Sequence, residues 1–373
     1  MSKIEHFLTN RLQQRADLQS LRKLTTVFPR IDFSSNDYLG FAKSQELQEL
    51  IATNTAINKA FKNGSGGSRL LSGNTAFTEY VEQFVADFHA APSGLIYNSG
   101  YDANVGLLSC IPQRGDTIIT DELIHASIID GCRLSYATRY KFNHNNLSDL
   151  KIKLELAKGN VFVVVESVYS MDGDVAPLPE LARLCKAYGA NLIVDEAHAT
   201  GIFGVQGKGL VTKYQLEEEV FARVITFGKA LGVHGAIVLG SKELRDYLIN
   251  FSRSFIYTTA APPYAIVAIL SAYQLLQRTD NNDLIENIEL FRQLAKGNKL
   301  VVLNSISAIQ GIIFKNNQQT RSAAAFLQQN GFDVRAILSP TVPEGKERLR
   351  ICLHTYNTRQ DIINLIDHLK ELN

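Results

Sequence analysis

The segment TFGKALG, residues 226–232, begins where a β-rich run, RVIT at 223–226, ends, and it carries Lys229 between two glycines. Small neighbours leave room for a bulky group against the backbone at this lysine. By itself, a lysine after a strand is most often a solvated surface charge. Three other segments change that interpretation: DEAH at 195–198, NSGYDAN at 98–104 and ERLR at 347–350. Together they favour a lysine that forms a Schiff base with a carbonyl cofactor.

Apolar runs typical of buried strands alternate along the chain with helix-like segments such as 178–189. The runs occupy residues 94–100, 117–120, 161–167, 191–198, 223–228 and 236–240. This alternation predicts an α/β fold with a mostly parallel sheet covered on both faces. Ligands of such sheets bind beyond the carboxyl ends of the strands, and polar side chains follow several of these runs.

Three of these polar side chains suit an aldehyde cofactor with a pyridine ring. Asp195 ends the strand LIVD, where a carboxylate is stable beside a protonated ring nitrogen. His198 can hydrogen-bond the ring oxygen, and His125 can stack on the ring face. The alternatives are an N-cap for Asp195 and ordinary structural roles for both histidines.

A turn of small residues supplies candidate phosphate donors. Gly100 and Tyr101 can offer backbone N–H groups, and Thr226 adds a hydroxyl. DEAH also occurs as a metal-binding box in ATP-driven helicases. That reading requires an upstream GxxxxGK[ST] segment, which the sequence lacks.

These residues in this order resemble the α-oxoamine synthases, a pyridoxal-phosphate family of fold type I. The matching stretches are spread over most of the chain, and their joint occurrence is highly specific. They are FSSNDYLG (33–40), GSGGSRLLSG (64–73), SGYDAN (99–104), HAS (125–127), ESVYSMDGD (166–174), VDEAHATG (194–201), TFGKALG (226–232), IYTTAAPP (256–263) and PTVPEGKERLR (340–350).

The resemblance implies a large cofactor-binding domain with a mostly parallel sheet and a small C-terminal α+β domain. It implies that Lys229 is the Schiff-base lysine and the base, with His125, Asp195 and His198 as its catalytic partners. The implied cofactor-binding set is Gly100, Tyr101, His125, Glu166, Ser170, Asp195, His198, Thr226, Lys229, Thr258 and Thr259. Thr258 and Thr259 would reach the phosphate of the neighbouring subunit, which implies a homodimer with shared active sites.

The resemblance also implies the reaction, a decarboxylative condensation of an amino acid with an acyl-CoA on pyridoxal 5'-phosphate. Members of the biotin pathway match best, which implies L-alanine and pimeloyl-CoA, or a pimeloyl-carrier protein, as substrates, and 8-amino-7-oxononanoate, CoA and CO₂ as products. Arg350 is the implied clamp on the amino-acid carboxylate. Arg22 and Thr341 match acyl-substrate positions, and Asn36 lies near the reacting centre.

The chain departs from the family at positions that bear on the acyl substrate. Leu338 and Ser339 stand where Arg-Pro is frequent, so a contact to an acyl carboxylate is lost, and His234 stands where small residues are common. Three other functions therefore stay open. They are a sister synthase that uses glycine or serine, an aminotransferase or lyase on the same fold, and a catalytically silent binding protein.

Composition and charge exclude several other classes of function. The 373 residues carry a net charge of +1, so no strong field attracts nucleic acid or an anionic membrane. The four cysteines have no zinc-ligand spacing, and we expect them to be reduced and mostly buried in a cytoplasmic protein without a metal site. We expect an N-terminal helical segment at 1–36, a large domain at 37–275 and a small domain at 276–373.

Overall fold

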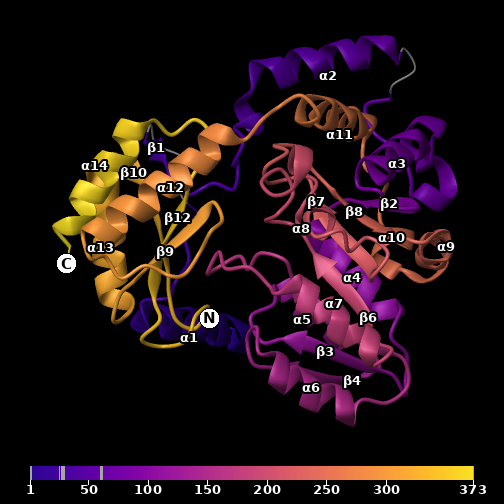
Figure 1. Cartoon of the computed structure of the whole chain (residues 1–373), viewed down its shortest axis with the longest axis horizontal. Helices are drawn as coiled ribbons and strands as arrows, with labels where there is room; N and C mark the ends of the chain where they lie inside the picture. Colours follow the sequence, from indigo (N-terminus) through magenta and orange to yellow (C-terminus); the bar gives the residue numbers. More distant parts are fainter. Residues whose placement is uncertain (1, 25, 27–29, 59–61, 373) are drawn as a thin grey trace. The chain divides into compact units, whose positions relative to one another are not determined.

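The computed structural model describes residues 2–24, 26, 30–58 and 62–372, and it divides into two compact units (Figure 1). The large unit comprises Asn36–Ser170 and Val175–Asn282, and the small unit comprises Met1–Ser35, Met171–Asp174 and Asp283–Asn373. The N-terminal segment thus groups with the C-terminal residues. The three-domain division with boundaries after 36 and 275 stays a prediction.

A seven-stranded sheet in the order β2-β8-β7-β6-β5-β3-β4 forms the centre of the large unit. Its strand β8 pairs antiparallel with both of its neighbours, and the other pairs are parallel. The predicted mostly parallel sheet is therefore confirmed. The strands are β2 (Ser93–Tyr97), β3 (Thr117–Asp121), β4 (Thr138–Phe142), β5 (Val161–Glu166), β6 (Asn191–Asp195), β7 (Val220–Thr226) and β8 (Ala236–Gly240).

Helices surround this sheet, and both of its faces are buried. Phe162, Val163, Val164 and Val165 of β5 are successive residues that point alternately to opposite faces, and none is more than 5% exposed. The α-helices are α2 (Gln45–Ile57), α3 (Ala76–Phe88), α4 (Gly100–Cys110), α5 (Ala126–Leu134), α6 (Leu147–Leu156), α7 (Leu178–Ala187), α8 (Leu210–Lys213), α9 (Lys242–Phe251), α10 (Arg253–Ile256) and α11 (Pro263–Leu276). Short irregular helices are η1 (Phe41–Lys43), η2 (Arg69–Gly73) and η3 (Val205–Gly207).

In its described residues, the small unit combines two small sheets with four α-helices. In one sheet β1 (Ile31–Asp32) runs parallel to β10 (Phe332–Asp333), and the other has the antiparallel order β11-β12-β9. Its remaining elements are α1 (Lys3–Asp17), α12 (Asn282–Gly297), β9 (Ile309–Ile313), α13 (Asn317–Gln329), β11 (Arg335–Ile337), β12 (Arg348–Cys352) and α14 (Arg359–Lys370). The segment 171–174 joins this unit through an ion pair between Asp172 and Arg348.

The edge strand β4 escaped the sequence analysis. Among its residues only Phe142 is buried, because the strand lies at the end of the sheet and pairs with β3 alone. An apolar run therefore could not mark it. This strand shows that the apolar-run criterion finds the interior of a parallel sheet and not its edge.

The expectation for the cysteines can be compared with the structure. All four cysteines are free and buried, as expected. Among the described residues, no helix has the length and apolar character that a membrane crossing requires.

Candidate active site

A cavity of about 260 Å³ lies at the carboxyl ends of β5, β6 and β7 in the large unit. It gathers the predicted residues that end or follow these strands together with those at the start of α4 and α5. Its lining consists of Asn36, Ser99, Gly100, Tyr101, Asn104, His125, Ser127, Glu166, Asp195, Ala197, Thr226, Gly228, Lys229, His234 and Gly235.

Lys229 is held in this cavity by a chain of hydrogen bonds. Its Nζ lies 2.8 Å from Nε2 of His198, and Nδ1 of the same ring lies 2.8 Å from the hydroxyl of Tyr38. The Tyr38 hydroxyl donates its hydrogen to Oδ1 of Asn36 at 3.1 Å. With that hydrogen directed at Asn36, the Tyr38 hydroxyl accepts from Nδ1 of His198, and Nε2 is then the acceptor for the Lys229 amine.

A second relay runs from Asp195 to His125. Nδ2 of Asn104 donates to Asp195 Oδ2 at 2.7 Å and to Ser127 Oγ at 3.0 Å. Ser127 Oγ then donates to Nδ1 of His125 at 2.8 Å, and the backbone N–H of Ala197 donates to Asp195 Oδ1 at 2.9 Å. The carboxylate of Asp195 is 5% exposed, so it is fixed and nearly dry in the cavity wall. Such a carboxylate is a suitable partner for a cationic group.

Burial gives two groups of the cavity unusual protonation. Burial, reinforced by the charge of Asp195, raises the pKa of Glu166 to about 8, although Lys229 and the backbone N–H groups of His125 and Ser170 act in the opposite direction. Burial lowers the pKa of His125 and Lys229 adds to the effect, while Asp195 opposes it. Near neutral pH, His125 is therefore a neutral ring, and Glu166 retains its proton.

The N-terminus of α4 forms the wall opposite the end of β7. A Cβ atom at Gly100 would lie 2.5 Å from Cγ2 of Thr226, so only a glycine fits there without displacement. The Thr226 hydroxyl oxygen is buried and has no hydrogen-bond partner among the described residues. An unpartnered hydroxyl beside the free backbone N–H groups of a helix start is suited to an anionic ligand.

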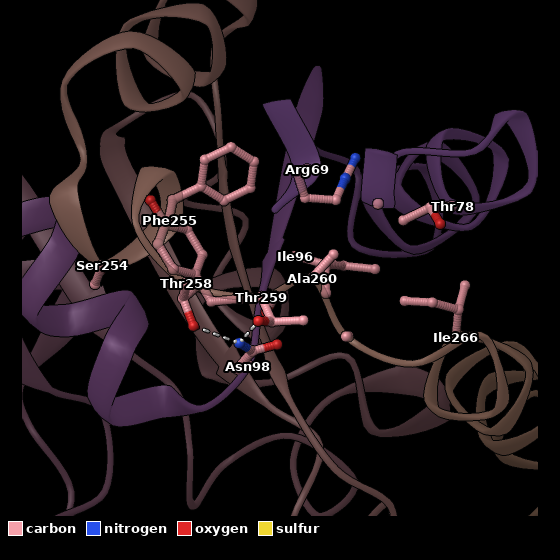
Figure 2. A pocket seen from close by; sticks show the side chains of 13 residues that line it. Arg69, Thr78, Ile96, Asn98, Ser254, Phe255, Thr258, Thr259, Ala260 and Ile266 are labelled. Atoms are coloured by element: carbon pink, nitrogen blue, oxygen red, sulfur yellow. Dashed lines mark hydrogen bonds between the residues drawn. The ribbon is translucent and has the colours of Figure 1, made fainter. Parts of the chain in front are cut away.

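Thr258 and Thr259 lie away from this cavity. They line a separate hollow of about 20 Å³ with Arg69 and Phe255, and Figure 2 shows Asn98 reaching both threonines. Nδ2 of Asn98 donates to Thr258 Oγ1 at 3.2 Å and to the backbone oxygen of Thr259 at 2.9 Å. Within one chain, the structure thus does not bring the two threonines to Lys229, and their role stays a prediction.

The remaining predicted substrate residues belong to the small unit. Nη2 of Arg22 lies 3.5 Å from Oγ1 of Thr341, so two positions 319 residues apart in sequence are in contact. Arg350 lies on β12, is 9% exposed, and approaches Sγ of Cys352 at 3.0 Å. Their roles also stay predictions.

Sequence reasoning did not assign a function to Tyr38, Asn104 or Ser127. All three occur in stretches that carry the family resemblance, which was the available signal. Ser170, by contrast, was assigned to the cofactor but does not line the cavity. It contributes the backbone N–H that hydrogen-bonds Glu166.

Comparisons with known proteins agree with this architecture. The family model for aminotransferase class I and II matches residues 29–369. The chain belongs to the aminotransferase class I and II family. An 8-amino-7-oxononanoate synthase from Emericella nidulans is 44% identical over 389 residues, which cover 96% of this chain and 93% of that protein.

Solved structures of two enzymes superpose closely on this chain. A serine palmitoyltransferase from S. paucimobilis with bound PLP has a TM-score of 0.90 at 26% identity and covers 100% of this chain and 98% of its own. An 8-amino-7-oxononanoate synthase from Francisella tularensis has a TM-score of 0.79 at 30% identity, with coverages of 92% and 97%. The fold is therefore fold type I of pyridoxal-phosphate-dependent transferases, as the sequence resemblance implied.

Proposed function

We propose that this chain is a pyridoxal-phosphate-dependent acyltransferase that condenses L-alanine with pimeloyl-CoA, or with a pimeloyl-carrier protein. The products are 8-amino-7-oxononanoate, CoA (or the free carrier) and CO₂, which places the enzyme in biotin biosynthesis. The observation that carries the proposal is the cavity in which the Lys229 amine, the Asp195 carboxylate and the orphan Thr226 hydroxyl meet. The 44% identity to an 8-amino-7-oxononanoate synthase supports the choice of reaction.

The residues of the cavity fit pyridoxal phosphate. Lys229 would hold its aldehyde carbon, Asp195 its protonated ring nitrogen, His198 its ring oxygen, and neutral His125 its ring face. Thr226 and the backbone N–H groups of Gly100 and Tyr101 would hold the phosphate, with Glu166 in the wall and Ser170 behind it, bonded to Glu166 through its backbone N–H. When bound, the cofactor supplies an electron sink for the electron pair that remains on the substrate α-carbon.

The side chains of this chain perform the proton transfers. The amine of Lys229 takes the proton from the α-carbon of the amino acid, and Nε2 of His198 orients that amine by accepting a hydrogen bond. The α-carbon then bonds to the thioester carbonyl carbon, the thiol of CoA leaves, and the resulting β-keto acid loses CO₂. Arg350 would fix the amino-acid carboxylate with two parallel hydrogen bonds, with Asn36 near the reacting carbon.

We further propose that the enzyme is a cytoplasmic homodimer. Thr258 and Thr259 would reach the phosphate of the neighbouring subunit, which is supported by their separation from Lys229 within one chain. The free buried cysteines suit a reducing compartment.

Release of CoA tests the proposal directly. The reconstituted enzyme is supplied with pimeloyl-CoA and, in parallel, with L-alanine, glycine or L-serine. We expect CoA release with L-alanine and little with the other two amino acids. Release without any amino acid, or release that is no faster with L-alanine than with glycine or L-serine, contradicts the proposed reaction.

The second candidate is a sister synthase that uses serine or glycine with a different acyl-CoA. The TM-score of 0.90 to a serine palmitoyltransferase favours it. It predicts CoA release from palmitoyl-CoA with L-serine, which the same assay measures.

A further inference from the structure

A cavity of about 900 Å³ in the small unit is rich in positive charge. It lies among the segment after α1, the helix α13 and the stretch from β11 to Thr341. Among the residues that the structure describes, five cationic side chains and no carboxylate line it: Arg15, Arg22, Lys23, Arg321 and Arg335. Apolar side chains such as Ile337 and Leu338 form part of the same wall. Its volume is within the range of small-molecule sites, and its lining suits an apolar chain with anionic groups.

Arg321 is the least satisfied of these cations. Arg335 is neutralised by Asp333 at 3.0 Å, whereas Arg321 forms no ion pair with any carboxylate among the described residues. Arg321 is also only partly exposed, while the other four are exposed, and its Nε atom is buried without a hydrogen-bond partner. A partly desolvated guanidinium without a counter-charge is stabilised when an anion enters beside it.

We infer that this cavity binds the anionic part of the acyl donor and that Arg321 is a specificity-determining residue. The inference rests on the proposed function. The shared ligand chemistry is an anionic oxygen group attached to an apolar chain. It has two possible sources, the carboxylate at the far end of a dicarboxylic acyl chain or the phosphates of the CoA carrier.

The proposal also accounts for Leu338. Related sequences often have an arginine at this position, so we expected this chain to lack a contact to the acyl carboxylate. Leu338 and Arg321 line the same cavity, together with the touching pair Arg22 and Thr341. A leucine at 338 therefore does not remove positive charge from this site. The cation comes from α13 instead of from the loop after β11.

The test compares Arg321→Gln with Arg359→Gln in the reconstituted enzyme. Arg359 begins α14 in the same unit, is exposed and lies outside the cavity, so it controls for the loss of one charge. Three donors are used: pimeloyl-CoA, heptanoyl-CoA, which lacks the far carboxylate, and S-pimeloyl pantetheine, which lacks the phosphates. We expect Arg321→Gln to raise the KM of pimeloyl-CoA about tenfold or more with little change in kcat.

The two sources give opposite patterns. If the far carboxylate is the ligand, the KM of pimeloyl pantetheine rises and that of heptanoyl-CoA does not. If the phosphates are the ligand, the reverse holds. A KM that is unchanged within about twofold for all three donors, or that rises equally in Arg359→Gln, overturns the proposal.

Two additions keep the test decisive. Leu338→Glu leaves Arg321 in place but adds a carboxylate to the cavity, so it should raise the same KM by pairing with Arg321. Calorimetric binding of pimelate and of CoA to the reconstituted enzyme needs no turnover. If wild type releases no CoA from pimeloyl-CoA and L-alanine, the proposed function fails. The cavity proposal then survives only if wild type binds one of these two probes and Arg321→Gln does not.

Discussion

Lys229 is the residue on which the proposed chemistry depends. We predict that Lys229→Ala lowers kcat by at least about 1,000-fold, because the base is removed. The midpoint of thermal unfolding should change little, since the lysine is only half-buried. Steady-state CoA release measures the loss. Lys242→Ala, at an exposed position at the start of α9, should retain wild-type activity. Near-normal turnover in Lys229→Ala would falsify the assignment of the site.

The Tyr38 hydroxyl sets the tautomer of His198. Tyr38→Phe removes the hydroxyl that bonds the buried Nδ1 of His198, a loss worth about 1–3 kcal/mol, and it allows the ring proton to move to Nε2. Once protonated, Nε2 no longer accepts a hydrogen bond from the Lys229 amine, so we predict a fall in kcat of about 10- to 100-fold. Nitrogen NMR of labelled histidine reports the tautomer independently of activity.

A matched control for this variant exists in the same unit. Tyr273 is equally buried, and its hydroxyl lies 2.9 Å from Nε2 of His89, outside the cavity. Tyr273→Phe should lose comparable stability and keep its kcat. Equal losses of kcat in both variants would mean that Tyr38 acts only through stability.

The raised pKa of Glu166 predicts how the stability of the protein depends on pH. A carboxyl group whose pKa rises on folding holds its proton more tightly in the folded state. The free energy of unfolding therefore falls as the pH increases from about 4.5 to about 8, and this contribution is constant above that range. In the cofactor-free protein, Glu166→Gln should make this decline shallower. Urea titrations at several pH values measure it.

The control for this prediction is Glu180→Gln, at a partly exposed glutamate on α7 that forms an ion pair with Arg183. Its pH profile should match that of wild type. An unchanged slope in Glu166→Gln would show that Glu166 is ionised in the folded protein at neutral pH.

At the scale of elements, the start of α4 is the most constrained position of the site. Gly100→Ala places a methyl group 2.5 Å from Thr226 Cγ2, so the helix start and the end of β7 must separate. We predict that pyridoxal phosphate binds about tenfold or more weakly, as measured by absorbance during reconstitution. Gly297→Ala at the end of α12 meets no atom within 4 Å and should bind the cofactor normally. If both variants bind the cofactor with equal affinity, the start of α4 does not bind the phosphate.

The elements also show what sequence can and cannot predict. Asp195, Thr226 and Lys229 follow apolar strands that were recognisable from composition, so their meeting at one edge of the sheet was predictable. Tyr38 and His198 lie 160 residues apart, and their contact depends on tertiary packing that no local pattern encodes. Helix α1 ends at Asp17, and Gln19 just beyond it adopts a left-handed φ of 51° that no glycine signals in the sequence.

The apolar residues of α3 give a similar lesson. Val81, Val85 and Phe88 recur at helical spacing and are buried, but Tyr80, beside Val81 on the same side, is 54% exposed. Its ring instead packs against those of Phe77 and Phe84 along the helix, at centroid distances of 6.3 and 6.2 Å. Apolar residues at helical spacing predict which side of a helix is apolar. How many residues on that side become buried depends on the elements that pack against it.

At the scale of the whole molecule, the shared active site of the proposed homodimer can be tested by complementation. Lys229→Ala and the double variant Thr258→Val with Thr259→Val should each be poorly active alone. In a mixed dimer, one site combines an intact Lys229 with intact threonines from the other subunit, while the second site carries both defects. Random mixing should therefore restore about a quarter of wild-type activity, because half of the dimers are mixed and each has one working site.

Co-expression of the two variants, followed by measurement of CoA release, provides the test. The control is co-expression of wild type with a chain that carries all three substitutions. In these mixed dimers, no active site has both an intact Lys229 and intact threonines. If each active site were instead built from one chain, the mixture of single-defect chains would stay as inactive as its components. The wild-type mixture would then keep half of its activity, since every wild-type chain would work regardless of its partner. The two mixtures therefore separate a shared site from a self-contained one without requiring a structure of the dimer.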